Sequence, residues 1–277
     1  MRMEELARFA SRIKQGQQEE RKLEMSNNVK MPDEFQAGTT KYQLNLIYLL
    51  DTSGSMSGEP INQLNAAMAE AVQVAEAAAK DKEVQLLMRV VEFNTVAKWL
   101  IGDKYNGVEH IDWAPLVANG GTDTAGAIDL VRSVMHREIL GERNYRPVVI
   151  LITDGASNDP EKTVEAIAKL KSSLKSSKDP NKDKITRIAI GVTGANQTEL
   201  TNFASVGDIE RDDNTIDKNV PFVFNVDDVE LLKGLLKGVT VSSILSSIGE
   251  GVDGNGADAP VITPVPEEEG DGGDWVE

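Results

Sequence analysis

The feature that most constrains the fold is an apolar segment that ends abruptly in polar residues, within residues 44–57 (LNLIYLLDTSGSMS). Its first half consists of Leu, Ile and Tyr with a single Asn, which is typical of a strand buried on both faces. Such a strand places Asp51 at its carboxyl end, the edge where open α/β sheets carry their sites. Pro60 suits the first turn of a following helix, because its missing N–H is not needed there. We therefore expect a strand, a tight turn and a helix.

The turn itself combines a carboxylate with hydroxyl groups. Asp51, Ser53 and Ser55 supply these oxygens, and Gly54 permits a tight turn between the two serines. Hard oxygen ligands at this density favour a divalent cation such as Mg²⁺. The structural alternative is that Asp51 closes a turn or caps the helix and that the serines are ordinary turn residues.

Composition narrows the possible functions. The chain has no cysteine and only two histidines, His110 and His136. This excludes disulfides and cysteine nucleophiles, and it argues against a histidine-rich metal site. A formal net charge of −16 repels phosphate backbones and anionic lipid, so we expect neither nucleic acid nor membrane as a partner. The N-terminus lacks the apolar core of a signal peptide and no segment is apolar for long enough to span a bilayer, which predicts a cytoplasmic protein.

Apolar strand patterns alternate with amphipathic helical patterns from residue 41 onward. Strands are expected at residues 44–51, 84–93, 96–101, 148–153, 185–192 and 221–226, and helices at 61–80, 125–139, 160–174, 196–204 and 229–248. This order predicts an α/β fold, a doubly wound and mostly parallel sheet with helices on both faces. Only two residues join the second and third strands, so we expect a hairpin and one antiparallel edge strand. Residues 207–219 are expected to form a polar, acidic loop.

The two ends differ in composition from the predicted domain, residues 41–248. Residues 1–40 are predicted to form an N-terminal helix and a linker. The apolar stripe of that helix would either dock on the domain or bind a partner. Residues 249–277 are rich in Gly, Pro, Asp and Glu, and we expect them to be an acidic, disordered tail.

Two further loops carry oxygen ligands. Thr122 lies in the segment GGTDT, and Asp154 follows the apolar strand VVILIT. With DTSGS, these residues match the pattern DxSxS, a distant Thr and a distant Asp. The chain therefore resembles von Willebrand factor type A (VWA) domains with a complete metal-ion-dependent adhesion site (MIDAS), over about residues 42–248. Turn chemistry alone does not require Thr122 and Asp154 as well, which favours the metal site over the structural alternative.

The resemblance implies a ligand set and a mode of action. Ser53 and Ser55 would bind Mg²⁺ directly, Asp51 and Asp154 would hold it mostly through water, and Thr122 would join directly or through water. Mn²⁺ or Ca²⁺ could replace Mg²⁺. Few direct carboxylates leave much of the cation's charge unneutralised, so an Asp or Glu of a protein partner can complete the coordination.

Polar residues near these loops have simpler explanations. Helix capping accounts for Asp123 and Thr124, and Asp159 before Pro160 is expected to be an N-cap. Trp113 and His110 are expected to pack a loop on the sheet edge, with a partner surface as the alternative.

We expect a binding protein and not an enzyme. A phosphatase of the aspartyl-phosphate kind carries DxD in this turn, but here Ser53 replaces the second acid and removes the expected general acid. GxSxG and GxxxxGK[ST] motifs are absent from the sequence. A Mg²⁺-dependent hydrolase remains the weaker alternative.

The three motif segments are similar to those of intracellular bacterial, tellurite-resistance TerY-like VWA proteins, which are associated with kinases and phosphatases in stress-response systems. This similarity implies an adaptor or scaffold whose MIDAS binds a partner carboxylate. An adaptor for an AAA+ ATPase is the alternative, and an exported adhesin is a weaker one.

Overall fold

The structure is a computed structural model that describes residues 43–82, 84–102, 107–108, 111–140, 144–174, 184–192, 194–210 and 215–249. The predicted N-terminal helix and linker, the acidic tail beyond Gly249, and His110 lie outside these ranges. Within them, no helix has the length and apolar character needed to cross a membrane.

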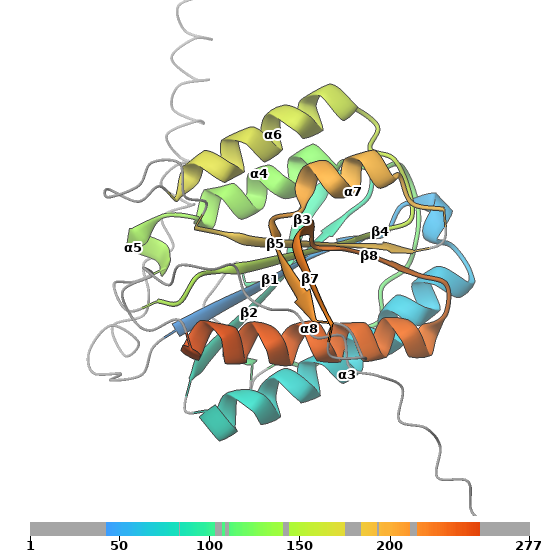
Figure 1. The fold of residues 1–277 in the computed structure, drawn as a ribbon. Coiled ribbons are helices and arrows are strands. Elements are labelled where there is room, and N and C mark those ends of the chain that lie inside the picture. Colours follow the sequence, from blue (N-terminus) through green and yellow to red (C-terminus); the bar gives the residue numbers. More distant parts are fainter. Residues whose placement is uncertain are drawn as a thin grey trace, which may run out of the picture. The chain divides into compact units, whose positions relative to one another are not determined.

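A six-stranded sheet forms the centre of the domain (Figure 1). Its order is β3-β2-β1-β4-β5-β8, with β1 (Gln43–Asp51), β2 (Gln85–Phe93), β3 (Ala97–Ile101), β4 (Val148–Thr153), β5 (Thr186–Val192) and β8 (Val223–Val226). Neighbouring strands run parallel except β3, which is antiparallel to β2. The predicted fold class is therefore confirmed, including the antiparallel edge strand.

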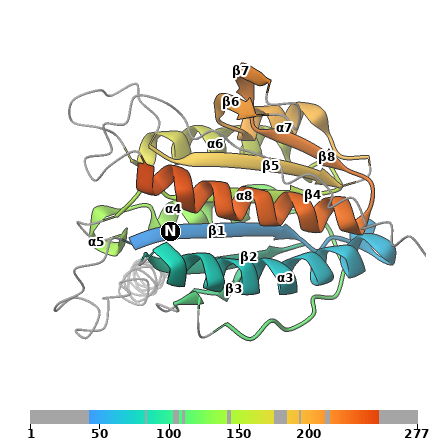
Figure 2. The ribbon, with the colours of Figure 1, turned by 60° about the horizontal axis from the view of Figure 1, so that its bottom comes forward.

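Helices cover both faces of this sheet (Figures 1 and 2). On one face lie α3 (Glu59–Lys82) and α8 (Val229–Gly249), and on the other lie α4 (Thr124–Val134), α6 (Pro160–Ser173) and α7 (Gln197–Phe203). Side chains of β1 alternate between the two cores: Tyr48 packs with residues of α3 and α8, whereas Ile47 packs with residues of α4 and α6. Every residue of β1 is buried, as expected for a strand covered on both faces.

Part of the buried face of helix α3 is made of small side chains. Ala67, Ala71 and Ala75 recur every four residues and are at most 1% exposed. They form one face of a helix that packs against both α8 and the sheet. Pro60 occupies the first turn of α3, as predicted.

Two expectations about the second half of the chain were wrong. The predicted helix at 125–139 is divided: α4 ends at Val134, and the short α5 (Arg137–Leu140) follows. Met135 closes α4 by donating its backbone N–H to Arg132 O at 3.1 Å, yet its side chain is fully buried. An apolar residue at helical spacing therefore hides the break in the pattern.

The predicted polar loop at 207–219 contains strands. β6 (Val206–Glu210) and β7 (Ile216–Pro221) pair antiparallel as a separate two-stranded sheet, so the final sheet strand begins at Val223 and not at Pro221. Asn219 has a φ of 63°, and its N–H donates to the Asp208 carboxylate at 3.0 Å. β7 has no buried residue, and three of its six residues are exposed, so apolar alternation does not mark this strand.

Candidate metal centre

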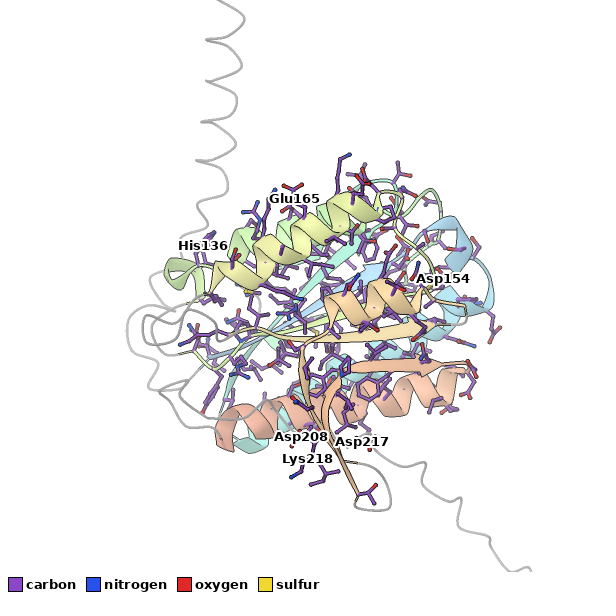
Figure 3. The ribbon with its side chains drawn as sticks, turned by 45° about the horizontal axis from the view of Figure 1, so that its top comes forward. His136, Asp154, Glu165, Asp208, Asp217 and Lys218 are labelled. Carbon is purple, nitrogen blue, oxygen red and sulfur yellow. The ribbon has the colours of Figure 1, made fainter. Side chains whose placement is uncertain are left out.

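The five predicted ligands lie at the carboxyl edge of the sheet. Asp51 is the last residue of β1, and Asp154 directly follows β4, its parallel neighbour in the sheet. The pairing of Leu50 with Ile152 brings the ends of these strands together. Figure 3 shows Asp154 at this end of the domain and His136 at the opposite end.

A continuous chain of hydrogen bonds joins four of the five residues. Asp51 Oδ1 accepts from the backbone N–H of Ser53 at 2.8 Å. The hydroxyls of Ser53 and Ser55 lie 3.0 Å apart in a hydrogen bond, and Ser55 Oγ donates to Asp154 Oδ1 at 2.8 Å. Ser53 is the N-cap of the 3₁₀ helix η1 (Gly54–Met56), and Ser55 lies within it. Two carboxylates and two hydroxyls from separate loops therefore converge on one place.

The loop of Thr122 is held against the other two loops by its backbone. Gly120 O accepts from Gly54 N at 2.9 Å, and Asn119 N donates to Thr52 O at 2.8 Å. On its other side, Thr122 O accepts from Asn158 N at 2.9 Å. The Thr122 side chain is 7% exposed. The third loop thus lies between the segments that carry Ser53 and Asp154.

Burial dominates the electrostatics of the two carboxyl groups. It raises the pKa of Asp51, whose side chain is fully buried, and hydrogen bonds from Thr153 and Ser53 oppose that rise. The neighbouring Asp154 raises the pKa of Asp51 slightly further, because two like charges disfavour each other. Burial also raises the pKa of Asp154, against the hydrogen bond from Ser55. A cation placed between these groups would favour their charged forms.

The donor set fits a hard divalent cation. Carboxylate and hydroxyl oxygens are the ligands that Mg²⁺ and Ca²⁺ prefer. Across the described ranges, no group of three or more His, Cys, Asp or Glu side chains is placed to hold a metal. A cation at this edge would therefore depend on the hydroxyls of Ser53 and Ser55.

Two of the three predicted capping residues near the site, Asp123 and Asp159, cap helices in the structure. Asp123 caps α4 by accepting from Gly126 N at 3.0 Å, and Asp159 caps α6 by accepting from Lys162 N at 3.1 Å. Thr124 is the first residue of α4. Trp113 is partly buried and packs against the core on the α3 side, which supports the loop-packing interpretation.

Sequence reasoning missed a supporting residue, Thr153. Its hydroxyl donates to Asp51 Oδ2 at 2.5 Å, so both oxygens of Asp51 are engaged by the protein. The only signal in the sequence was a polar residue at the end of the apolar strand VVILIT. A second supporting residue is Glu92, whose carboxylate accepts from the Thr52 hydroxyl at 3.3 Å and forms an ion pair with Lys98.

Comparison with known proteins identifies a family. A model of the von Willebrand factor type A domain matches residues 45–237. A search of curated proteins gave no match. Among solved structures, a von Willebrand factor type A protein from Catenulispora acidiphila is 20% identical with a TM-score of 0.53, and the alignment covers 74% of this chain and 43% of that one.

Proximal thread matrix protein 1 from the mussel byssus is 19% identical with a TM-score of 0.49, covering 74% and 47% of the two chains. A structure of the same mussel protein with a zinc-occupied MIDAS motif is 18% identical with a TM-score of 0.49, covering 74% and 46%. The alignments span less than half the length of these solved chains. At these identities the likeness to the Catenulispora protein supports the fold alone, and the mussel structures are too distant for their metal to be transferred to this chain.

Proposed function

Because this chain belongs to the von Willebrand factor type A family, we propose that it is a metal-dependent protein-binding module. The proposed ligands are Asp51, Ser53, Ser55, Thr122 and Asp154, with Mg²⁺ as the cation. The observation that carries this proposal is the hydrogen-bond chain from Asp51 through Ser53 and Ser55 to Asp154. It gathers oxygen donors from loops that are about one hundred residues apart in the sequence.

The residues of the site have distinct tasks. Ser53 and Ser55 offer neutral oxygens, whereas Asp51 is oriented by Ser53 N and Thr153 Oγ1. A bound Mg²⁺ would supply a charge that these donors neutralise only in part. The exposed Ser55, next to the half-buried Asp154, leaves the site open to solvent on that side. A partner Asp or Glu can approach there and complete the coordination.

Binding is favoured over catalysis by the same residues. Ser53 stands where an aspartyl-phosphate enzyme would carry its second acid, and hydrolysis needs a general base close to the reacting water. His136 lies at the other end of the domain from Asp154 (Figure 3). We therefore assign the site to recognition, in a cytoplasmic adaptor or scaffold of the TerY-like kind. An adaptor for an AAA+ ATPase is the second candidate from the family resemblance.

Titration calorimetry with Mg²⁺ and Mn²⁺ tests the cation site. The wild-type chain should bind one ion, and the double substitution Ser53→Ala plus Ser55→Ala should abolish binding. Asp154→Asn is titrated in the same way, and Asp129→Asn is its matched control. Asp129 is exposed, and its ion pair with Arg132 contributes little to stability. Absence of binding by the wild type would contradict the proposal.

Affinity capture tests the partner. Proteins retained by the wild-type chain in Mg²⁺ should be released by EDTA and lost with Asp154→Asn, but retained with Asp129→Asn. Identification of a kinase or phosphatase would support the TerY-like function. Identification of an AAA+ ATPase would support the second candidate, an adaptor for that enzyme. Capture that is independent of both EDTA and Asp154 would remove the metal from the mechanism.

A further inference from the structure

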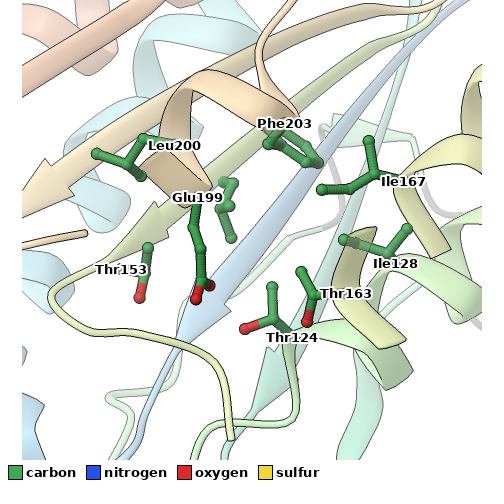
Figure 4. Close-up of a pocket in the computed structure, with 9 residues that line it drawn as sticks. Thr124, Ile128, Thr153, Thr163, Ile167, Glu199, Leu200 and Phe203 are labelled. Atoms are coloured by element: carbon green, nitrogen blue, oxygen red, sulfur yellow. The ribbon is translucent and has the colours of Figure 1, made fainter. Parts of the chain in front are cut away.

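A small cavity lies behind the candidate metal centre, between the sheet, α4, α6 and α7 (Figure 4). Its volume is about 10 Å³, which is enough for one water molecule. One part of its lining is polar, and the rest consists of apolar side chains of the core. The polar residues are Thr124, Thr153, Thr163 and Glu199.

Glu199 is the charged residue of this cavity. Its Oε2 accepts a hydrogen bond from the backbone N–H of Ser157 at 3.0 Å. Its Oε1 is buried and has no hydrogen-bond partner among the residues that the structure describes. In Figure 4 the carboxylate points toward the threonine hydroxyls. A buried carboxylate oxygen without a hydrogen-bond partner costs free energy, so we expect a hydrogen-bond donor for this oxygen inside the cavity.

The neighbours of Glu199 lead to all three loops of the metal centre. Ser157, which Glu199 holds, lies three residues after Asp154. The next residue, Asn158, donates its N–H to Thr122 O at 2.9 Å. Across the cavity, Thr153 donates to Asp51 Oδ2 at 2.5 Å. The Glu199 carboxylate on α7 thus holds the segment that follows Asp154. This segment in turn holds the Thr122 loop through the N–H of Asn158.

We propose that Glu199 is a positioning residue of the metal centre, which acts through Ser157 and through one water that joins its Oε1 to the threonine hydroxyls. This inference rests on the proposed metal-binding function. Groups that orient metal ligands without touching the metal commonly change affinity 10- to 100-fold when removed. The position of Glu199 on a helix makes it a more rigid anchor than a residue of the loops themselves.

Three variants and three measurements test this role. Glu199→Ala removes the acceptor of the Ser157 amide, Glu199→Gln keeps an acceptor oxygen, and Glu165→Ala is a control that removes an exposed glutamate from α6. The measurements are Mn²⁺ affinity by calorimetry, the Tm of the metal-free protein, and the hydrogen exchange of the Ser157 and Asn158 amides without metal.

We expect Glu199→Ala to weaken Mn²⁺ binding by about 10-fold or more and to speed exchange at Ser157 and Asn158. Glu199→Gln should restore most of both properties, and Glu165→Ala should match the wild type. A crystal structure should show a water within hydrogen-bond distance of Glu199 Oε1, and a dry cavity would contradict the water link.

The outcomes separate this role from a purely structural one. If Glu199→Ala lowers the metal-free Tm but leaves Mn²⁺ affinity unchanged, Glu199 only stabilises the fold and the inference is overturned. If the wild-type chain itself does not bind Mn²⁺, the proposed function fails first and the inference fails with it. Wild-type binding with unchanged affinity in Glu199→Ala overturns the inference alone.

Discussion

The candidate site depends on residues that are positioned before any ion arrives. Both oxygens of Asp51 accept hydrogen bonds, from Ser53 N and from Thr153 Oγ1, so this carboxylate has one orientation. The Ser55 hydroxyl is held by Asp154 in the same way. Preorganisation of this kind lowers the entropy that binding would otherwise cost.

On acidification, metal binding should begin to weaken at a higher pH than it would if both aspartates had ordinary pKa values. Burial raises the pKa of both Asp51 and Asp154, so protons compete with the cation above the usual range for Asp. Calorimetry with Mn²⁺ from about pH 7 down to about pH 4 checks this expectation. An affinity that begins to fall only in the range of an ordinary Asp, about pH 4, would contradict it.

In the metal-free protein, acidification should have the opposite effect: it should favour the wild type over a variant that lacks the Asp51 carboxyl. A carboxyl whose pKa is raised by folding stabilises the fold at low pH, and that contribution is lost as the pH rises through the folded pKa. In EDTA, the Tm difference between Asp51→Asn and the wild type should therefore favour the variant most at neutral pH and shift toward the wild type on acidification. A Tm difference that does not change with pH would show that folding does not raise the pKa of Asp51.

Gly120 should be intolerant of a side chain. Its φ is 75°, and an added Cβ would press against the hydroxyl of Thr95, which accepts from Gly121 N at 2.9 Å. Gly120→Ala should cost roughly 1–2 kcal/mol for the backbone conformation, plus the displacement of Thr95. It should also weaken Mn²⁺ binding, because Gly120 O holds Gly54 between the two serines.

Gly58→Ala is the matched control for Gly120→Ala. Gly58 has a φ of 88°, but nothing lies within 4 Å of the position of its added Cβ. The control should therefore show only the backbone cost in chemical denaturation, with Mn²⁺ affinity unchanged. Equal stability and equal affinity in the two variants would show that the contact with Thr95 is unimportant.

At the scale of elements, the strands were the most predictable part of the chain. The apolar runs that form β1 and β4 each end at a carboxylate, and this placed Asp51 and Asp154 at one edge of a parallel sheet. The break between α4 and α5 was not predictable, because Met135 stays buried across it. The β6–β7 ribbon was also missed, because β7 has no buried residue and Ile209 is the one buried apolar side chain of β6, which leaves no apolar alternation in the sequence.

A hydrogen bond between two buried hydroxyls joins β1 and α8 across the core. It predicts that the fold loses stability at alkaline pH. Tyr48 on β1 and Thr240 on α8 are fully buried and hydrogen-bonded at 2.9 Å, and burial raises the pKa of Tyr48 to about 12. The folded state thus keeps the proton that the unfolded chain loses near pH 10. Stability from this group should be present below about pH 10 and lost progressively toward pH 12, on the order of 3 kcal/mol.

Comparison with Tyr48→Phe isolates this effect. The variant lacks the titrating hydroxyl, so its free energy of unfolding should fall less steeply than that of the wild type over the alkaline range. Urea denaturation at a series of pH values measures both slopes. Parallel slopes for the two proteins would show that Tyr48 ionises normally in the fold.

At the scale of the whole molecule, the site exists only when distant segments are assembled. The motif residues could be predicted from the sequence because their types and order are distinctive. Supporting residues such as Thr153 and Glu199 could not, since their contacts to Asp51 and Ser157 join residues 102 and 42 positions apart and follow only from the packed fold. An ion that requires all three loops together binds the native state and not the unfolded chain.

The last prediction follows from this linkage. Mg²⁺ should raise the Tm of the full chain, because at a free concentration of 100 Kd a ligand of the native state alone adds about 2.7 kcal/mol. For a domain of this size that corresponds to an increase of about 5–10 °C. Scanning calorimetry in Mg²⁺ and in EDTA should show the shift for the wild type and for Asp129→Asn, but not for Ser53→Ala plus Ser55→Ala. If the double variant is stabilised by Mg²⁺ as much as the wild type, the ion binds somewhere other than the edge where β1 and β4 end.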